Sequence, residues 1–156
     1  MKRQLTSGHT VTDHATAAGA PAETHMVTRY SFAFDPRFAR LLRLLGVRPE
    51  RAYVEIADGN LEARFGPWLV TTPLANVEHS SVTGPHRRLR AIGPRFSPST
   101  RSLTFGSNAD RTVRIAFRRP VPGMEPLGIV KHPSLSVSVA DPEQLQRHLD
   151  ALSEQG

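Results

Sequence analysis

Histidines and carboxylates are the side chains that could carry catalysis or bind a metal in this chain, because its 156 residues include no cysteine. His79, His86 and His132 are far apart in the sequence. The chain contains no glycine-rich phosphate loop, no nucleophile elbow and no His-Glu-x-x-His motif. The sequence therefore predicts no catalytic residue, no metal site and no bound cofactor.

Glu78 and His79 are neighbours in a predicted strand, where adjacent side chains point to opposite faces of the sheet. They are therefore not expected to act together on one substrate. His79 shares the predicted face of Val77 and Ser81, and we interpret it as a hydrogen-bonded core histidine.

Arginine is the residue type whose clustering points to binding. The chain has a formal net charge of +6, and residues 85–119 alone hold nine arginines against a single acid, Asp110. Such a concentration of positive charge indicates an anionic partner. The candidate surface combines a loop rich in glycine and proline with the outward side of a following strand: Arg87, Arg88, Arg90 and Arg95 in the loop, and Arg114 and Arg118 on the strand.

The partner expected at this surface is an acidic protein or an anionic membrane face. Nucleic acid is a further alternative that the sequence favours less, because Phe96 offers a stacking group but no recognised motif accompanies it. The competing interpretation is that the arginines are merely solvated. All but two of the twenty basic residues are arginine, as is typical of a GC-rich genome.

Alternating apolar and polar residues predict a series of short strands. Asp58-Gly59-Asn60 is a strong turn signal and predicts a hairpin between strands 52–56 and 61–65. Strands 103–106 and 112–118 are expected to pair with each other. The remaining predicted strands are 27–34, 68–72, 77–82 and 134–139, with 86–92 as a short basic strand or turn. The inward side chains should be Val54, Ile56, Leu61, Ala63, Phe65, Val113, Ile115, Phe117, Leu135, Val137 and Val139.

A first helix is predicted over residues 36–45, beginning at Asp35 and Pro36 and ending at Gly46. Phe38, Leu41, Leu42 and Leu45 form its apolar stripe, with Arg37, Arg40 and Arg43 opposite. A basic amphipathic helix can lie on a membrane. Because this one has only about three turns, we interpret it as packed on the core with a solvated arginine side.

A closing helix is predicted over residues 142–152. Asp141 can cap it, Pro142 suits its first position, and Gln144 completes a capping-box spacing. Its apolar stripe is formed by Leu145, His148, Leu149 and Leu152.

The chain is long enough for one domain with a tail, and we place the boundary at residues 25 and 26, with the domain over 26–153. Residues 1–25 have no aromatic and few aliphatic residues, which predicts disorder. Since Met26 follows directly, the tail is alternatively an overextended gene start. The irregularly spaced His9, His14 and His25 do not suggest a metal site. No apolar run approaches the roughly 20 residues that span a bilayer, and the absence of a signal peptide predicts a cytoplasmic protein.

The run VEIADGNLEARFG at residues 54–66 resembles the early hairpin of bacterial pleckstrin-homology-like (PH-like) domains. The likeness extends over residues 50–152 through the order of strands and the closing helix. It implies an α+β, mostly β fold: a strongly bent antiparallel sheet, or small barrel-like roll, plugged by helix 142–152. Segment 87–142 also resembles uncharacterised bacterial proteins of similar length, which implies no activity. The Asp58-Gly59-Asn60 turn lacks the basic residues of the eukaryotic phosphoinositide signature, so inositol-lipid binding is not implied.

The leading strand and helix at residues 27–45 also resemble the START-like helix-grip arrangement, which encloses an apolar ligand. The closing helix, at about three turns, is short for that arrangement. We therefore expect a non-catalytic binding or adaptor module that uses the arginine surface. The alternative is a helix-grip carrier or enzyme, which needs an apolar cavity of some 300–1,000 Å³.

Overall fold

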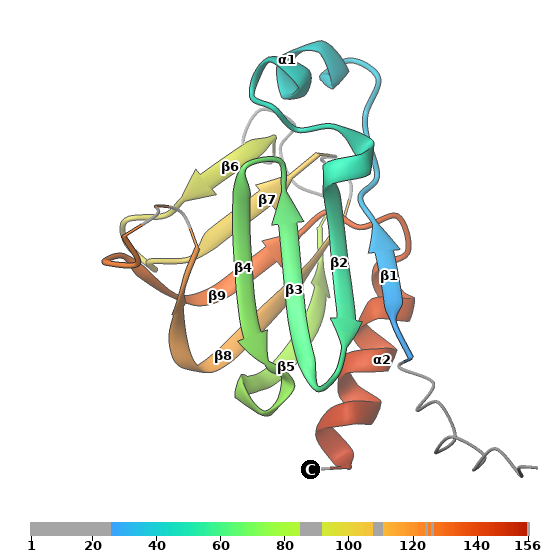
Figure 1. Cartoon of the computed structure of the whole chain (residues 1–156), viewed down its shortest axis with the longest axis vertical. Helices are drawn as coiled ribbons and strands as arrows, with labels where there is room; N and C mark the ends of the chain where they lie inside the picture. Colours follow the sequence, from blue (N-terminus) through green and yellow to red (C-terminus); the bar gives the residue numbers. More distant parts are fainter. Residues whose placement is uncertain (1–25, 85–91, 108–110, 124, 126, 156) are drawn as a thin grey trace, which may run out of the picture.

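The computed structural model describes residues 26–84, 92–107, 111–123, 125 and 127–155. Two stacked sheets form its body, with a short helix at one end and a longer helix along one side (Figure 1). In chain order the elements are β1 (Thr28–Ser31), α1 (Ala39–Leu44), η1 (Pro49–Arg51), β2 (Ala52–Ala57), β3 (Asn60–Phe65), β4 (Trp68–Pro73), η2 (Leu74–Asn76), β5 (Val77–Thr83), β6 (Gly93–Phe96), β7 (Leu103–Gly106), β8 (Thr112–Pro122), β9 (Lys131–Val137) and α2 (Pro142–Glu154).

The first sheet has the order β1-β2-β3-β4 and is antiparallel throughout. Its hairpin β2–β3 turns at Asp58 and Gly59, which have φ values of 50° and 74°. Positive φ at both central residues is the geometry of a type I′ turn, and its twist matches that of the strands. The predicted hairpin is confirmed, with Ala57 paired to Asn60.

The second sheet has the order β5-β8-β9-β7-β6. Strand β7 pairs in parallel with β9 and antiparallel with β6. The predicted pairing of 103–106 with 112–118 is therefore wrong, because β9 lies between β7 and β8. The mostly β, α+β class is confirmed. The single bent antiparallel sheet that was predicted is instead two separate sheets, which do not close into a barrel. One strand pair, β7 with β9, is parallel.

The core lies between the two sheets, whose strands cross obliquely (Figure 1). The ring of Phe65 stacks on Phe105 at 5.3 Å between centroids and lies 5.2 Å from Phe32. These three rings lie in the core between the sheets. All of the side chains predicted to face inward are buried: Val54, Ile56, Leu61, Ala63, Phe65, Val113, Ile115, Phe117, Leu135, Val137 and Val139.

Residues 31–33 join the two sheets. After β1, Phe32 forms a bridge with Val139, and the backbone N–H of Ala33 donates to the carbonyl of Ser138. The N–H of Ala140 donates to the carbonyl of Ser31 at 2.9 Å. The predicted strand over 27–34 is thus shorter, because the chain leaves the first sheet to pair with the segment after β9.

Helix α2 begins as predicted, since the Asp141 carboxylate accepts the N–H of Gln144 at 3.1 Å. Leu145 and Leu149 are buried, and α2 packs mainly against β5. His148 Nδ1 lies 2.8 Å from the hydroxyl of Tyr30 on β1. The helix therefore bridges the β5 edge of one sheet and the β1 edge of the other. No helix in the described residues is long and apolar enough to cross a membrane.

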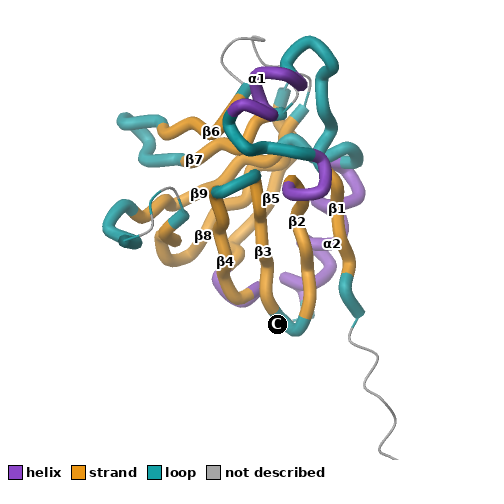
Figure 2. Tube along the Cα trace, turned by 45° about the horizontal axis from the view of Figure 1, so that its top comes forward, coloured by secondary structure: helices purple, strands orange, loops and turns teal. Residues whose placement is uncertain are grey.

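Helix α1 covers the end of the molecule at which β3 ends and β4 begins (Figures 1 and 2). It has six residues, fewer than predicted, because the chain forms turns up to Phe38. Only Leu42 of the helix is buried. The prediction that its apolar stripe packs on the core holds for Leu42 and in part for Phe38, but Leu41 and Leu45 are exposed.

Candidate binding face on the second sheet

The six predicted arginines divide between described and undescribed parts of the chain. Arg87, Arg88 and Arg90 lie outside the described residues. The other three occupy two strands of the second sheet and are exposed: Arg95 on β6, and Arg114 and Arg118 on β8.

Strand register connects Arg95 to Arg114 across the sheet. Arg95 pairs with Thr104, Thr104 with Ser136, and Ser136 with Arg114. Ser81 of β5 pairs with Arg114 on its other side, so these residues form one row across the sheet. Paired residues of neighbouring strands share one face, so the two arginines lie on the same surface with small hydroxyl residues between them. Residues distant in sequence are brought together here by non-local pairing.

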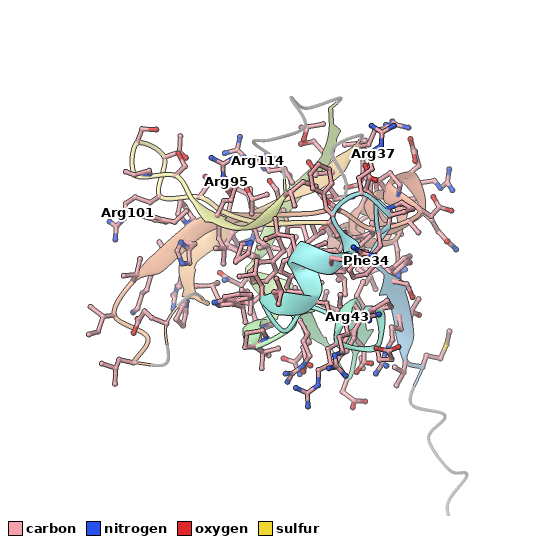
Figure 3. All side chains as sticks on the ribbon, turned by 90° about the horizontal axis from the view of Figure 1, so that it is seen from above. Phe34, Arg37, Arg43, Arg95, Arg101 and Arg114 are labelled. Carbon is pink, nitrogen blue, oxygen red and sulfur yellow. The ribbon has the colours of Figure 1, made fainter. Side chains whose placement is uncertain are left out.

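The spacing of this row sets what it can bind. Three strand spacings separate Arg95 from Arg114, which is roughly 14 Å between backbones. Figure 3 shows both arginines on the same side of the molecule. Arg118 lies four residues beyond Arg114, on the same alternation of β8. The positive charge is therefore spread over a broad surface and suits an extended acidic partner better than a single small anion.

The residues around the row are small and polar rather than acidic. His79, Ala116 and Ser134 form the adjacent row, and the hydroxyls of Thr83 and Thr112 lie 2.9 Å apart in another. No carboxylate occupies these register positions. We call the exposed side of β5–β9 that carries Arg95, Arg114 and Arg118 the arginine face.

Not every arginine of the basic segment contributes free charge. Arg111 forms an ion pair with Glu143 in the first turn of α2. Arg114 and Arg118 form no ion pair with any other described residue. The charge count from the sequence therefore overstates the positive charge available to a partner, but leaves two β8 arginines available.

The core position predicted for His79 is wrong, because its side chain is exposed. A β-bulge lies between Val77 and His79: Val77 pairs with Phe117, and His79 pairs with Ala116. The extra residue reverses the alternation, as bulges do, and turns Ser80 inward instead. Among the described residues, no group of three or more His, Asp or Glu side chains could hold a metal.

His132 is a buried histidine of the second sheet. It is 1% exposed and lies within β9. Its Nδ1 donates to the carbonyl of Arg101 at 3.0 Å, since a carbonyl can only accept. Its Nε2 has no described hydrogen-bond partner, and its ring packs edge-on against Phe96. The hydrogen bond to the Arg101 carbonyl requires a proton on Nδ1.

Apart from the arginine face, a concave region lies between the edge of β4 and the connection from β8 to β9. Its volume is about 620 Å³, and its described lining is Pro67, Trp68, Leu69, Thr71, Pro122, Gly123, Glu125 and Gly128. The Glu125 carboxylate accepts the backbone N–H groups of Val130, Leu127 and Ile129. These hydrogen bonds stabilise the ionised carboxylate and so lower the pKa of Glu125, and the one from Val130 has the largest effect. Sequence reasoning missed this region, because its lining comes from segments that only the fold brings together.

Comparisons with protein-family models, with curated proteins and with solved structures find no match to this chain.

Proposed function

We propose that this protein is a non-catalytic binding module, of PH-like type, whose arginine face engages an acidic protein surface. The observation that carries the proposal is the register row Arg95–Thr104–Ser136–Arg114, which puts two exposed arginines on one face without an intervening carboxylate. Arg118 extends the same positive surface along β8. For Arg87, Arg88 and Arg90 the proposal rests on the sequence alone.

The surroundings of the arginines favour protein over the other anionic partners. Single-stranded nucleic acid is held by aromatic side chains on a basic surface, and no aromatic ring other than that of His79 stands among the described row positions. Insertion into a bilayer needs exposed apolar groups, whereas the row carries serine and threonine. Small hydroxyl residues separate the two exposed arginine side chains.

The architecture is consistent with the PH-like part of the proposal. Two stacked sheets with a C-terminal helix along one side follow the element order of that resemblance. The filled interior supports a binding module rather than the alternative of a helix-grip carrier, since Phe32, Phe65 and Phe105 occupy the space between the sheets.

The test is a titration of the protein with poly-glutamate, a single-stranded oligonucleotide and anionic vesicles at low salt. Poly-glutamate should bind, and its affinity should fall as salt rises, because exposed charges are screened over roughly 8 Å at physiological ionic strength. The triple variant Arg95→Glu, Arg114→Glu, Arg118→Glu should lose this binding.

A matched control reverses three arginines elsewhere: Arg37→Glu, Arg40→Glu and Arg43→Glu. It has the same net charge as the face variant and should retain poly-glutamate binding. Equal loss in both triple variants would mean that net charge alone governs binding, and would refute the arginine face as a site. Binding of the oligonucleotide alone would refute the choice of partner.

A further inference from the structure

Helix α1 presents leucines to solvent rather than to the core. Leu41 is 52% exposed and Leu44 is 85% exposed, and Leu45 directly after the helix is exposed as well. Positions i, i+3 and i+4 lie on one side of a helix, so these three side chains form one stripe. The neighbouring Leu42 is completely buried. The segment thus has two apolar sides, and the core uses only one of them.

Arginines surround the exposed leucines. Arg37, Arg40 and Arg43 are all exposed and form no ion pair with another described residue. Looking down onto α1, Figure 3 shows Arg37 and Arg43 on two different sides of it. Residues 35–51 contain five arginines and two acids. We call Leu41, Leu44 and Leu45 with Arg37, Arg40 and Arg43 the leucine–arginine tip.

A backbone hydrogen bond and a close backbone contact hold the tip against the first sheet. After α1, the N–H of Val47 donates to the carbonyl of Leu42 at 2.8 Å, and Val47 is buried. A Cβ added at Gly66, which has a φ of 62°, would lie only 2.8 Å from the carbonyl oxygen of Gly46. The β3–β4 turn and the end of α1 therefore touch backbone to backbone. This contact fixes the leucines at the end of the molecule (Figures 1 and 2).

We propose that the leucine–arginine tip docks on an anionic membrane surface, with Leu41 and Leu44 in the interface and the arginines at lipid phosphates. A protruding end with exposed leucines fits a deformable bilayer better than a folded partner, which needs about 800 Å² of matching surface. The arginines supply the charge complementarity. The proposal is independent of the arginine face, which lies on the second sheet.

Vesicle co-sedimentation tests the proposal, using phosphatidylcholine vesicles with and without phosphatidylserine. The wild-type protein should bind only vesicles that contain phosphatidylserine, and less at high salt. Each basic residue near an anionic bilayer contributes about fivefold in binding. The double variant Arg40→Gln, Arg43→Gln should therefore weaken binding about 25-fold. Replacing Leu41 and Leu44 by serine should weaken it about tenfold or more.

The matched control removes two leucine-sized side chains from another exposed site. Leu127 and Ile129 are 78% and 74% exposed, and the variant Leu127→Ser, Ile129→Ser should bind vesicles as the wild type does. The arginine-face variant Arg95→Gln, Arg114→Gln, Arg118→Gln should keep most of the binding. The tip variants should melt at the wild-type temperature, because the replaced side chains are exposed.

Three results would overturn the proposal. The first is wild-type binding to vesicles that does not increase when they contain phosphatidylserine. The second is full binding by the Leu41→Ser, Leu44→Ser variant, which would leave the leucines outside the interface. The third is a dimer in sedimentation equilibrium that this leucine variant dissociates, which would assign the tip to a second copy of the chain.

Discussion

Replacing Leu149 by alanine should destabilise the protein by about 2–5 kcal/mol. Leu149 is 1% exposed and lies in the middle of α2, packed with Leu145 into the core. The substitution removes three buried carbon atoms, worth about 2.4 kcal/mol at ~0.8 kcal/mol each. The cavity left behind adds to this cost, because β5 and β8 are held by their own ladder and close only partly around it.

The consequence is large relative to the stability of a domain, which is typically about 5–15 kcal/mol. At about 4 °C per kcal/mol for a domain of this size, a loss of 2–5 kcal/mol corresponds to a fall in Tm of roughly 8–20 °C. Urea denaturation gives the free energy of unfolding directly, and an unchanged m value would show that both variants unfold from the same compact state. Circular dichroism follows α2 and the sheets together.

The matched control is Leu127→Ala, the same substitution at a leucine that is 78% exposed. It should change the free energy of unfolding by at most about 0.5 kcal/mol. If the Leu149 and Leu127 variants unfold at the same urea concentration, α2 does not contribute to the core, and the closing role assigned to it is wrong.

Three further predictions concern single hydrogen-bonding groups. Tyr30→Phe should lower the free energy of unfolding by about 1 kcal/mol in a urea titration, because it removes the hydroxyl that meets His148 Nδ1. Asp141→Ala should lower it by about 1 kcal/mol through loss of the α2 cap, whereas Asp141→Asn should keep most of it. Backbone hydrogen bonds, chiefly the one from Val130, lower the pKa of Glu125. These hydrogen bonds are therefore fully formed above the ordinary pKa of a glutamate. They are lost as the pH falls through the lowered pKa of Glu125. The protection of the Val130 amide, which is its exchange rate relative to the intrinsic rate at the same pH, should therefore fall in acid. Glu125→Gln should show no such dependence, and equal pH profiles of protection would refute the contact.

Sequence patterns predicted the features that local chemistry determines. The type I′ turn at Asp58-Gly59 needs only two residues that tolerate positive φ. The α2 cap needs Asp141 three residues before Gln144. Alternation identified the buried side of β2, β3, β8 and β9, because period-two burial is a property of the strand itself.

Features that depend on distant partners were not accessible in this way. The parallel pairing of β7 with β9 is non-local, and the serine-rich alternation of β9 is equally compatible with either neighbour. The bulge after Val77 turns His79 outward and Ser80 inward, and no glycine or other turn residue in the local sequence indicates it. The exposure of Leu41 beside a buried Leu42 likewise follows from where α1 ends on the sheet, not from its own stripe.

The candidate site illustrates the same division. The sequence identified Arg95 and Arg114 by charge, but only the order β8-β9-β7-β6 puts them in one row. The same fold removes Arg111 from the surface charge by pairing it with Glu143. Net charge therefore predicts that an anionic partner exists, and register decides which arginines can meet it.

The two proposed surfaces occupy different parts of the molecule, and this separation has a functional consequence. The leucine–arginine tip lies at the end covered by α1, whereas the arginine face is the outer side of the second sheet (Figures 1 and 3). A membrane at the tip leaves Arg114 and Arg118 turned to the side, where an acidic protein can still reach them. Both proposed partners are anionic, but the tip combines exposed leucines with arginines, whereas the arginine face carries serine and threonine between its arginines. If both proposals hold, the two surfaces can be occupied at the same time, because they lie on different parts of the molecule.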